Sequence, residues 1–305
     1  MDKVFVVVGF PLSIDMVKMV IENRWGEEID RIVDLREFTK DALYDAMENQ
    51  CDIFTAQERV NEKIEKAIAH SGNTLVFGQN HTPQSRLYIM QTIRKYGKSA
   101  YIVIDCPDIE LIKSRYPSSR EYITSVVRHF TIPIPSEFDD ITFVYHSYCD
   151  RMDDLIRRSQ RYHIKSNHHD ETIYQHGTEV RKMMEEKGYK DNYLLSAIQL
   201  HDLGKIDTQS VDKNGAYHYY GHPNAGSYRL ITHFTEAAKK KVYDGDPETD
   251  KKIYIAVATV CHHMAPYDWE TEGQRLYNKR IYGTELWKIL LDLNAADRAC
   301  SLRDD

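Results

Sequence analysis

Histidine and aspartate residues in the second half of the chain have the types and spacing of metal ligands. The strongest signal is LHDLGK, Leu200–Lys205, in which His201 and Asp202 are adjacent at the end of a helical pattern. An imidazole nitrogen and a carboxylate oxygen placed side by side can bind one divalent ion. A single His-Asp pair is weak evidence, because an ordinary helix end can carry the same two residues.

Further candidate ligands lie in or beside separate helical patterns on both sides of this pair. They occur in ETIYQHGTEV, YYGHPNAG, VCHHM and LNAADRA, as His176, His222, His262, His263 and Asp297. Side chains from several helices can converge in the core of a bundle, where metal sites of this kind are built. Neutral imidazole and carboxylate ligands suit Mn, Fe, Co, Ni or Zn, so we expect one or two divalent transition metals.

This order of motifs resembles the HD-domain metal-dependent phosphohydrolase superfamily over the segment from Tyr162 to Ser301. The resemblance implies that one divalent metal is bound by His176, His201, Asp202 and Asp297. It implies that a second metal, found in binuclear members, is bound by His222 and by one or both of His262 and His263. The methionine that follows the histidine pair favours His263 as the ligand.

The same resemblance implies a catalytic role for residues beside these ligands. Lys205 would face the substrate phosphate or pair with Asp202, and both are expected in the catalytic site. His169 precedes the first ligand helix and would line the substrate pocket. Two ions bridged by water would supply a hydroxide near neutral pH and hold a phosphate ester for in-line attack.

The first half of the chain alternates strand and helix patterns, which predicts a parallel α/β sheet. Strands are expected at Val4–Val8 and Ile32–Leu35 and in NTLVFGQNHT, SAYIVIDCP and DITFVYHS, and helices at Ile14–Trp25, Gln57–His70 and Ser85–Tyr96. After Tyr148 we expect no strand and six helices, at Asp150–Tyr162, Thr172–Lys187, Asn192–Asp202, Asn224–Phe234, Asp250–His263 and Thr284–Ser301. The prediction is therefore a two-domain chain, with an α/β domain at 1–149 and an all-α domain at 150–305.

The loop after the first strand has the layout of a phosphate-binding loop without its phosphate-binding residues. Against the pattern G-x-x-G-x-G-K-[ST], GFPLSIDM keeps Gly9 but has Leu12 and Ile14 at the glycine positions. Asp15 replaces the lysine and Met16 the magnesium-binding hydroxyl residue. Such a loop needs glycines so that backbone N–H groups can surround phosphate, and a lysine to neutralise it. We therefore expect no ordinary ATP binding.

The remainder of this half resembles P-loop polynucleotide kinases, although a generic α/β domain is the alternative. RIVDLREF places Asp34 where that family carries the acid that activates a 5′-hydroxyl, and Gly78 stands where it usually has aspartate. SRYPSSREYITSVVRHFTIPIPSEFDDI resembles the arginine-bearing lid, with Arg115, Arg120 and Arg128 as candidate phosphate contacts. The resemblance implies a degenerate kinase-like domain that serves binding or assembly, without kinase activity.

Composition limits the classes of function without choosing one. A net charge of −7 gives no overall attraction to nucleic acid, so such binding would need a local basic patch, for which Arg157, Arg158, Arg161 and Lys165 are candidates. Five scattered cysteines without a C-x-x-C spacing predict reduced thiols and a cytoplasmic location. No apolar run is long enough to cross a bilayer, so no membrane partner is expected.

Known end-healing enzymes that resemble this chain join a polynucleotide kinase to a phosphoesterase. The leading hypothesis is therefore a metal-dependent phosphoesterase that removes 2′,3′-cyclic phosphates or 3′-phosphates from RNA 3′ ends. One alternative is a phosphohydrolase of free or cyclic nucleotides. The other is a non-catalytic module that binds nucleic acid or a protein partner. The sequence leaves the identity and number of the metals and the oligomeric state open.

Overall fold

The computed structural model describes residues 2–40, 53–78, 80–146, 152–164, 171–239 and 245–301. By its contacts the chain divides into two compact units. The first consists of Met1–Pro107, Glu137–Val144 and Asp244–Pro247, and the second of Asp108–Ser136, Tyr145–Tyr243 and Glu248–Asp305. Compared with the expected ranges 1–149 and 150–305, the second unit also contains Asp108–Ser136 and residues 145–149, and the first also contains Asp244–Pro247. In Asp108–Ser136, the helix α6 (Arg120–His129) packs on α11 (His222–Lys239) of the second unit.

The first unit is built on a five-stranded sheet in which every strand is parallel to its neighbours. The strands are β1 (Lys3–Gly9), β2 (Arg31–Asp34), β3 (Thr74–Phe77), β4 (Ser99–Asp105) and β5 (Asp140–Phe143), in the order β2-β3-β1-β4-β5. The valine-rich β1 is central, and Val4–Val8 are buried on both faces, as such a run predicts for a parallel sheet. The expected parallel α/β sheet is confirmed.

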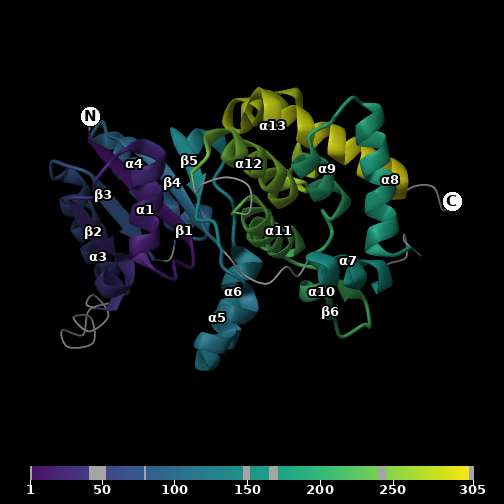
Figure 1. The fold of residues 1–305 in the computed structure, drawn as a ribbon, viewed down its shortest axis with the longest axis horizontal. Helices are drawn as coiled ribbons and strands as arrows, with labels where there is room; N and C mark the ends of the chain where they lie inside the picture. The colour runs from purple at the N-terminus through teal and green to yellow at the C-terminus, as the bar shows by residue number, and fades with distance from the viewer. Residues whose placement is uncertain are drawn as a thin grey trace. The chain divides into compact units, whose positions relative to one another are not determined.

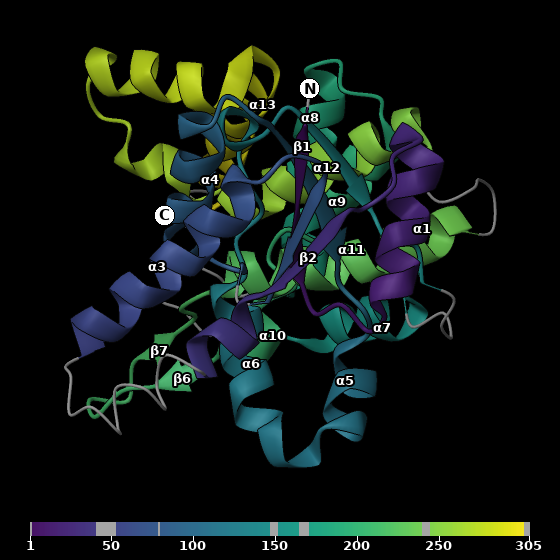
Figure 2. The ribbon, with the colours of Figure 1, turned by 90° about the vertical axis from the view of Figure 1, so that its left-hand side faces the viewer.

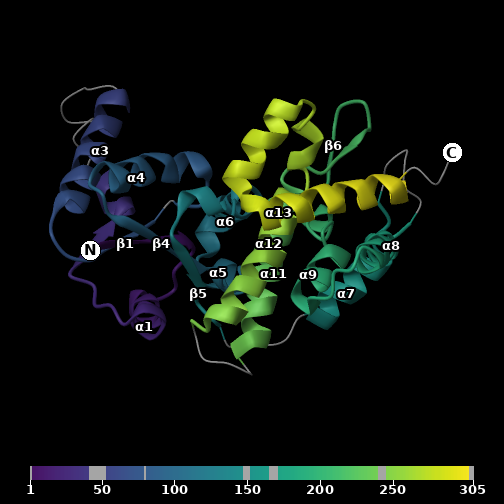
Figure 3. The same cartoon turned by 90° about the horizontal axis from the view of Figure 1, so that it is seen from above.

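Helices cover both faces of this sheet. In Figures 2 and 3, α1 (Ile14–Trp25) lies on one side of the strands, and α3 (Ile53–Ala69) and α4 (Pro83–Lys95) lie on the other. The apolar side of α1 packs against alternate residues of β1, Phe5 and Val7, because successive strand side chains point to opposite faces. The helix α3 begins at Ile53, earlier than the expected Gln57.

The second unit is mainly helical (Figure 1). Its α-helices are α5 (Ile109–Arg115), α6, α7 (Met152–Arg161), α8 (Ile173–Glu186), α9 (Asn192–Gln199), α10 (Lys205–Thr208), α11, α12 (Pro247–His262) and α13 (Glu272–Ser301). Short 3-10 helices occur along the chain at Pro117–Ser119, Pro135–Glu137 and Ala265–Asp268. Side chains of α8, α9 and α13 form one apolar core, which includes Val180, Leu195 and Leu293. Among the described residues, none of the helices is long and apolar enough to span a membrane.

Two features of this unit differ from the sequence prediction. A short antiparallel hairpin joins β6 (Ser210–Val211) to β7 (Tyr217–His218), so the prediction of no strand after Tyr148 is wrong. Strands of two residues are too short to show an alternating pattern. The helix α13 begins at Glu272 rather than Thr284 and bends at Gly283, where φ is 72°. Its first half is largely exposed and therefore lacks the apolar stripe that marks a packed helix.

Replacing Gly9 should destabilise the first unit far more than replacing Gly26, another glycine with positive φ. Gly9 has φ 120°, and an added Cβ would lie 2.1 Å from the carbonyl oxygen of Asp105. Gly26 also has positive φ, 66°, but an added Cβ would meet nothing within 4 Å. We expect Gly9→Ala to lower the free energy of unfolding by about 2–4 kcal/mol and Gly26→Ala by about 1 kcal/mol. Urea unfolding followed by circular dichroism measures the stability of both variants. Equal losses would contradict the idea that the contact with the Asp105 carbonyl is what requires glycine at position 9.

Candidate metal centre

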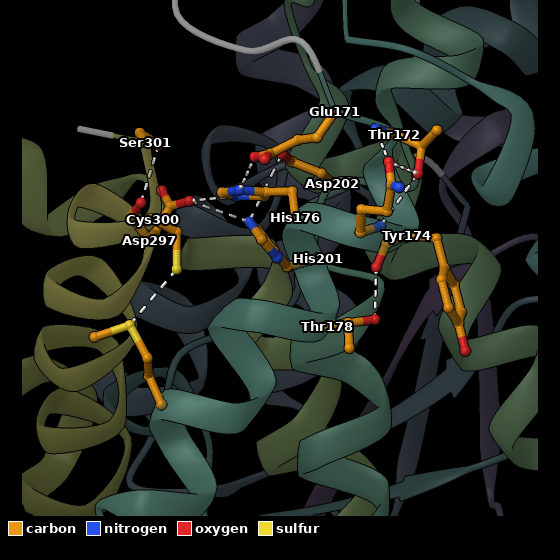
Figure 4. A network of polar contacts seen from close by, with 12 residues as sticks. Glu171, Thr172, Tyr174, His176, Thr178, His201, Asp202, Asp297, Cys300 and Ser301 are labelled. Carbon is orange, nitrogen blue, oxygen red and sulfur yellow. Dashed lines mark hydrogen bonds and ion pairs between the residues drawn. The ribbon is translucent and has the colours of Figure 1, made fainter. Parts of the chain in front are cut away.

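Four histidines and two aspartates from separate elements of the second unit converge on one buried cluster. His176 lies in the first turn of α8, His201 and Asp202 follow α9, and His222 begins α11. His263 follows α12, and Asp297 lies in the last turns of α13. All but Asp297 are buried, and Asp297 retains only 14% of its side-chain exposure. Figure 4 shows the part of this cluster around His176, His201, Asp202 and Asp297.

The cluster consists of two groups of donor atoms that share Asp202. In the first group, Asp297 Oδ1 lies 2.8 Å from His176 Nε2 and 3.5 Å from His201 Nε2, which is 3.7 Å from Asp202 Oδ2. In the second group, His222 Nε2 lies 3.3 Å from Asp202 Oδ1 and 3.3 Å from His263 Nε2. Asp202 therefore presents one oxygen to each group.

Two glycines allow the elements that carry these ligands to approach closely. A Cβ at Gly177 would lie 1.9 Å from the carbonyl oxygen of Gln199, so α8 can pack directly against the end of α9. A Cβ at Gly204 would lie 1.9 Å from the carbonyl oxygen of His222, so the turn after Asp202 packs directly on the start of α11. No larger residue fits either position without separating the backbones, and this separation would move ligands of both groups apart.

Each of the four histidines is oriented by a hydrogen bond at its other ring nitrogen. His176 Nδ1 lies 3.0 Å from Glu171 Oε1. The Nδ1 atoms of His201, His222 and His263 lie 2.7–2.9 Å from the carbonyl oxygens of Ile198, Tyr219 and Val260, respectively. Because a carbonyl oxygen only accepts, Nδ1 of these three rings carries a proton, so in the neutral form of each ring the lone pair is on Nε2, which faces the cluster. Metal-binding histidines are held in this way by groups outside the coordination sphere.

The donor atoms fit divalent metal ions in chemistry and in spacing. Nε2 of His201 is buried and makes no hydrogen bond within the described part of the chain. In neutral rings, Nε2 of His222 and Nε2 of His263 would place two lone pairs opposite each other at 3.3 Å, which a cation between them would relieve. Bonds of about 2.0–2.2 Å to one ion place neighbouring ligand atoms roughly 3–4 Å apart, close to the separations within each group.

Burial and neighbouring charges shift the pKa values of the cluster in opposite directions. Burial alone would raise the pKa of Asp202, but the ammonium of Lys205 and the neighbouring His201 lower it well below its usual value. Burial opposes the charged form of His201, but the carboxylates of Asp202 and Asp297 raise its pKa to about 9. Burial, together with the nearby His201 and His222, lowers the pKa of His263 to about 3. In the absence of a metal, His201 thus holds a proton between two carboxylates.

Lys205 was expected either to face the substrate phosphate or to pair with Asp202, and the structure shows it paired with Asp202. Lys205 Nζ lies 2.6 Å from Asp202 Oδ2 and 5.8 Å from the centre of the Tyr219 ring. Tyr267, which the sequence reasoning missed, donates its hydroxyl to Asp297 Oδ2 at 3.2 Å. Glu171 was also missed, although it lies in the same ETIYQH segment as His176. Tyr267 and Glu171 lie outside the cluster and hold Asp297 and His176, respectively, in place.

His262 lies outside both groups of donor atoms. Its Nε2 lies 3.0 Å from the carbonyl oxygen of Ile132, and its Nδ1 lies 3.5 Å from the hydroxyl of Tyr282. Consecutive residues at the end of a helix point about 100° apart, so only one of His262 and His263 can face the cluster. Of the two histidines, the structure brings His263 to the other ligands.

The predicted lid arginines are not part of either group of donor atoms. Arg120 and Arg128 line a cavity of about 550 Å³ beside α5 and α6, together with Lys113, His129 and two glutamates. Arg128 Nη2 also donates to the carbonyl oxygen of Asp207 at 2.9 Å. Arg115, at the end of α5, is exposed and is not among the residues lining that cavity. His169 and Lys165 lie outside the described residues.

The altered loop of the first unit makes hydrogen bonds to the end of β4 and to the start of α1. The N–H of Phe10 donates to the carbonyl oxygen of Asp105 at 2.8 Å, and Ser13 caps α1 by accepting from the N–H of Met16. Asp15 is exposed in the first turn of α1, where its negative charge faces the positive end of the helix dipole. Asp34 forms an ion pair with Arg36 at 2.8 Å.

His263→Ala and His262→Ala should differ in metal content. Removing His263 deletes a donor from the second group, so the purified variant should retain about one ion fewer per chain after incubation with Mn²⁺ or Zn²⁺. Removing His262 deletes contacts outside the cluster, so this variant should keep its metal and lose about 1 kcal/mol of stability. Plasma mass spectrometry measures the metal content. Equal metal loss in both variants, or loss only in His262→Ala, would refute the placement of these histidines.

Metal binding should release protons at neutral pH. With a pKa of about 9, His201 is protonated at pH 7 in the metal-free protein and must lose its proton before Nε2 can bind a metal. We expect release of about one proton per chain, and an apparent affinity that rises roughly tenfold per pH unit between about pH 6 and 8. His263, with a pKa of about 3, contributes none. Calorimetric titration in buffers of different ionisation enthalpy measures the release, and a pH-independent affinity would contradict this expectation.

Comparison with known proteins gives no family for the chain. No family model matches it, and no curated protein matches it. Among solved structures, it is similar to a chain from the PezAT chromosomal toxin–antitoxin system of Streptococcus pneumoniae. The two are 12% identical with a TM-score of 0.27, and the match covers 95% of this chain and 88% of that chain. A likeness at this score carries no argument about fold or function.

Proposed function

We propose that the chain is a metal-dependent phosphohydrolase of the HD-domain type, with its active site at the His-Asp cluster. The observation that supports this proposal is the convergence of four imidazole Nε2 atoms and two carboxylates, with a hydrogen bond at each opposite Nδ1. Such an arrangement has little value as a packed core, because buried acceptors that face one another are costly. It suits one or two ions of Mn, Fe, Co, Ni or Zn.

The grouping of the donor atoms supports a proposed ligand set for two ions. The first ion would be held by His176, His201, Asp202 and Asp297, and the second by Asp202, His222 and His263. When bound, such a pair supplies a hydroxide near neutral pH and neutralises the charge of a phosphoryl group. The chain itself positions the ligands, through the Glu171 contact to His176 and the Tyr267 contact to Asp297.

Lys205 is proposed as a catalytic residue together with its partner Asp202. Its ammonium lies 2.6 Å from Asp202 Oδ2 and retains 15% of its side-chain exposure. In this position it fixes the Asp202 carboxylate and adds positive charge at the edge of the cluster. A charge at this edge favours an anionic substrate, because little water screens it there. Lys205 would therefore contribute to binding of the phosphate as well as to the orientation of Asp202.

The proposed substrate is an RNA 3′ end that carries a 2′,3′-cyclic phosphate or a 3′-phosphate. Support comes from the polynucleotide kinase-like sequence of the first unit, which we propose as a degenerate domain for binding or assembly, and this is a fold-level analogy. Cys106, Cys261 and Cys300 form no disulfide within the described residues, which suits the cytoplasmic location proposed for such an enzyme. Free nucleotides are the alternative substrates.

Hydrolysis of an RNA oligomer with a 2′,3′-cyclic phosphate end, with Mn²⁺, Ni²⁺ or Co²⁺ added in turn, tests this proposal. We expect activity that falls more than about 100-fold in His201→Ala and Asp202→Ala, because both lose metal ligands. His262→Ala is the matched control and should remain active. The first unit should stay folded in all three variants, since none of the substitutions lies in it.

The other outcomes of this experiment separate the alternatives. Cleavage of mononucleotides alone would retain the metal site and reject RNA as the substrate. Metal retained at full stoichiometry in His201→Ala and Asp202→Ala would reject the ligand assignment. Less than one metal per chain, with no hydrolysis after addition of Mn²⁺ or Ni²⁺, would favour a non-catalytic binding module.

A further inference from the structure

A run of aromatic residues links the β6–β7 hairpin to the proposed active site. The segment YHYY, Tyr217–His218–Tyr219–Tyr220, covers β7 and the residues that follow it, just before His222 begins α11. Tyr220 is 75% exposed, the highest value among the large apolar side chains of the described residues. The hairpin projects away from the helices of its unit in Figures 1 and 3. At this exposure, burial in the core of the unit does not account for the ring.

The Tyr220 ring is held on one face by a neighbour. The rings of His218 and Tyr220 are stacked, with centres 5.2 Å apart and planes inclined by 9°. His218 Nε2 lies 3.3 Å from Asp212 Oδ2. Asp212 Oδ1 accepts from the N–H groups of Asn214 and Ala216 in the hairpin turn. The hairpin thus fixes His218, which supports Tyr220 in an offset stack.

The same segment contacts one proposed ligand, His222, and Lys205. The carbonyl oxygen of Tyr219 accepts from His222 Nδ1 at 2.9 Å, and the ring of Tyr219 lies beneath the ammonium of Lys205. Tyr220 is two residues from His222, so their Cα atoms are at most about 7.6 Å apart. Tyr220 therefore lies close along the backbone to a residue of the cluster, the one that begins α11.

We propose that Tyr220, supported by His218, is a stacking platform for the nucleobase attached to the phosphate that the cluster hydrolyses. A flat aromatic pair with one open face accepts any planar base, whereas a simple phosphomonoester has nothing to place there. The platform thus assigns nucleotides and RNA ends, rather than small phosphate esters, as the substrate class. This inference rests on the proposed phosphohydrolase function.

Binding of an RNA oligomer that ends in 2-aminopurine tests the platform, because the fluorescence of this base falls when it stacks. We expect Tyr220→Ala to raise the dissociation constant about tenfold and to remove the fluorescence loss, since one base–aromatic contact is deleted. Tyr220→Trp keeps an aromatic ring at this position, so it should show the affinity and the fluorescence loss of the unmodified protein. The matched control is Tyr277→Ala on α13, which removes another exposed tyrosine, 64% exposed. Unchanged binding by Tyr220→Ala would overturn the proposal.

A second measurement separates failure of the platform from failure of the proposed function. Hydrolysis is compared between a nucleoside 2′,3′-cyclic phosphate and the same ribose cyclic phosphate without a base. The platform predicts a higher kcat/KM for the substrate with the base, and a ratio that falls about tenfold in Tyr220→Ala. Equal kcat/KM values in the unmodified protein would overturn the platform and leave the phosphohydrolase proposal standing. Hydrolysis of neither substrate, and of no RNA oligomer with a 2′,3′-cyclic phosphate end, would reject the phosphohydrolase proposal, and binding that still depends on Tyr220 would then show base stacking without hydrolysis.

Discussion

The second unit has to keep several buried imidazole and carboxylate acceptors close together, and this requirement constrains the rest of its structure. Four imidazoles and two carboxylates occupy positions from which water is largely excluded, and burying such groups without a partner is unfavourable. The ammonium of Lys205 and the proton on His201 offset part of this cost in the metal-free chain. The proposed cations would offset much more of it. The surrounding helices have to hold these groups together against their repulsion.

Packing at some distance from the ligands supplies this restraint. The apolar core of α8, α9 and α13 fixes the helices that carry His176 and Asp297, while Gly177 and Gly204 allow backbone contact where the ligand-bearing segments meet. Three of the four histidine rings take their orientation from the carbonyl oxygen three residues earlier. Ring orientation is therefore set locally, and ring position is set by the packing of the helices.

The parts of this structure that the sequence predicts are those with a long-range pattern. The buried valines of β1 and the apolar spacing of α1 identify the parallel sheet and one of its helices. The spaced His and Asp motifs contain the residues that the structure brings together in the cluster. The β6–β7 hairpin and the first half of α13 were missed, because two-residue strands and an exposed helix carry no apolar periodicity. The choice between His262 and His263, and the need for glycine at 177 and 204, depend on contacts between distant segments. Spacing along the chain does not encode these contacts.

Asp202 belongs to both groups of donor atoms, with Oδ2 toward His201 and Oδ1 toward His222. For the proposed pair of ions, this shared carboxylate means that the two sites are not independent. An ion in the first group would add to the contact from Lys205 in holding the Asp202 carboxylate, and so would help to orient the oxygen that serves the second. By thermodynamic reciprocity, the second ion would raise the affinity of the first by the same factor. The number of ions bound would then change over a narrow range of metal concentration, and the proposed phosphohydrolysis would respond to metal supply as a threshold rather than in proportion.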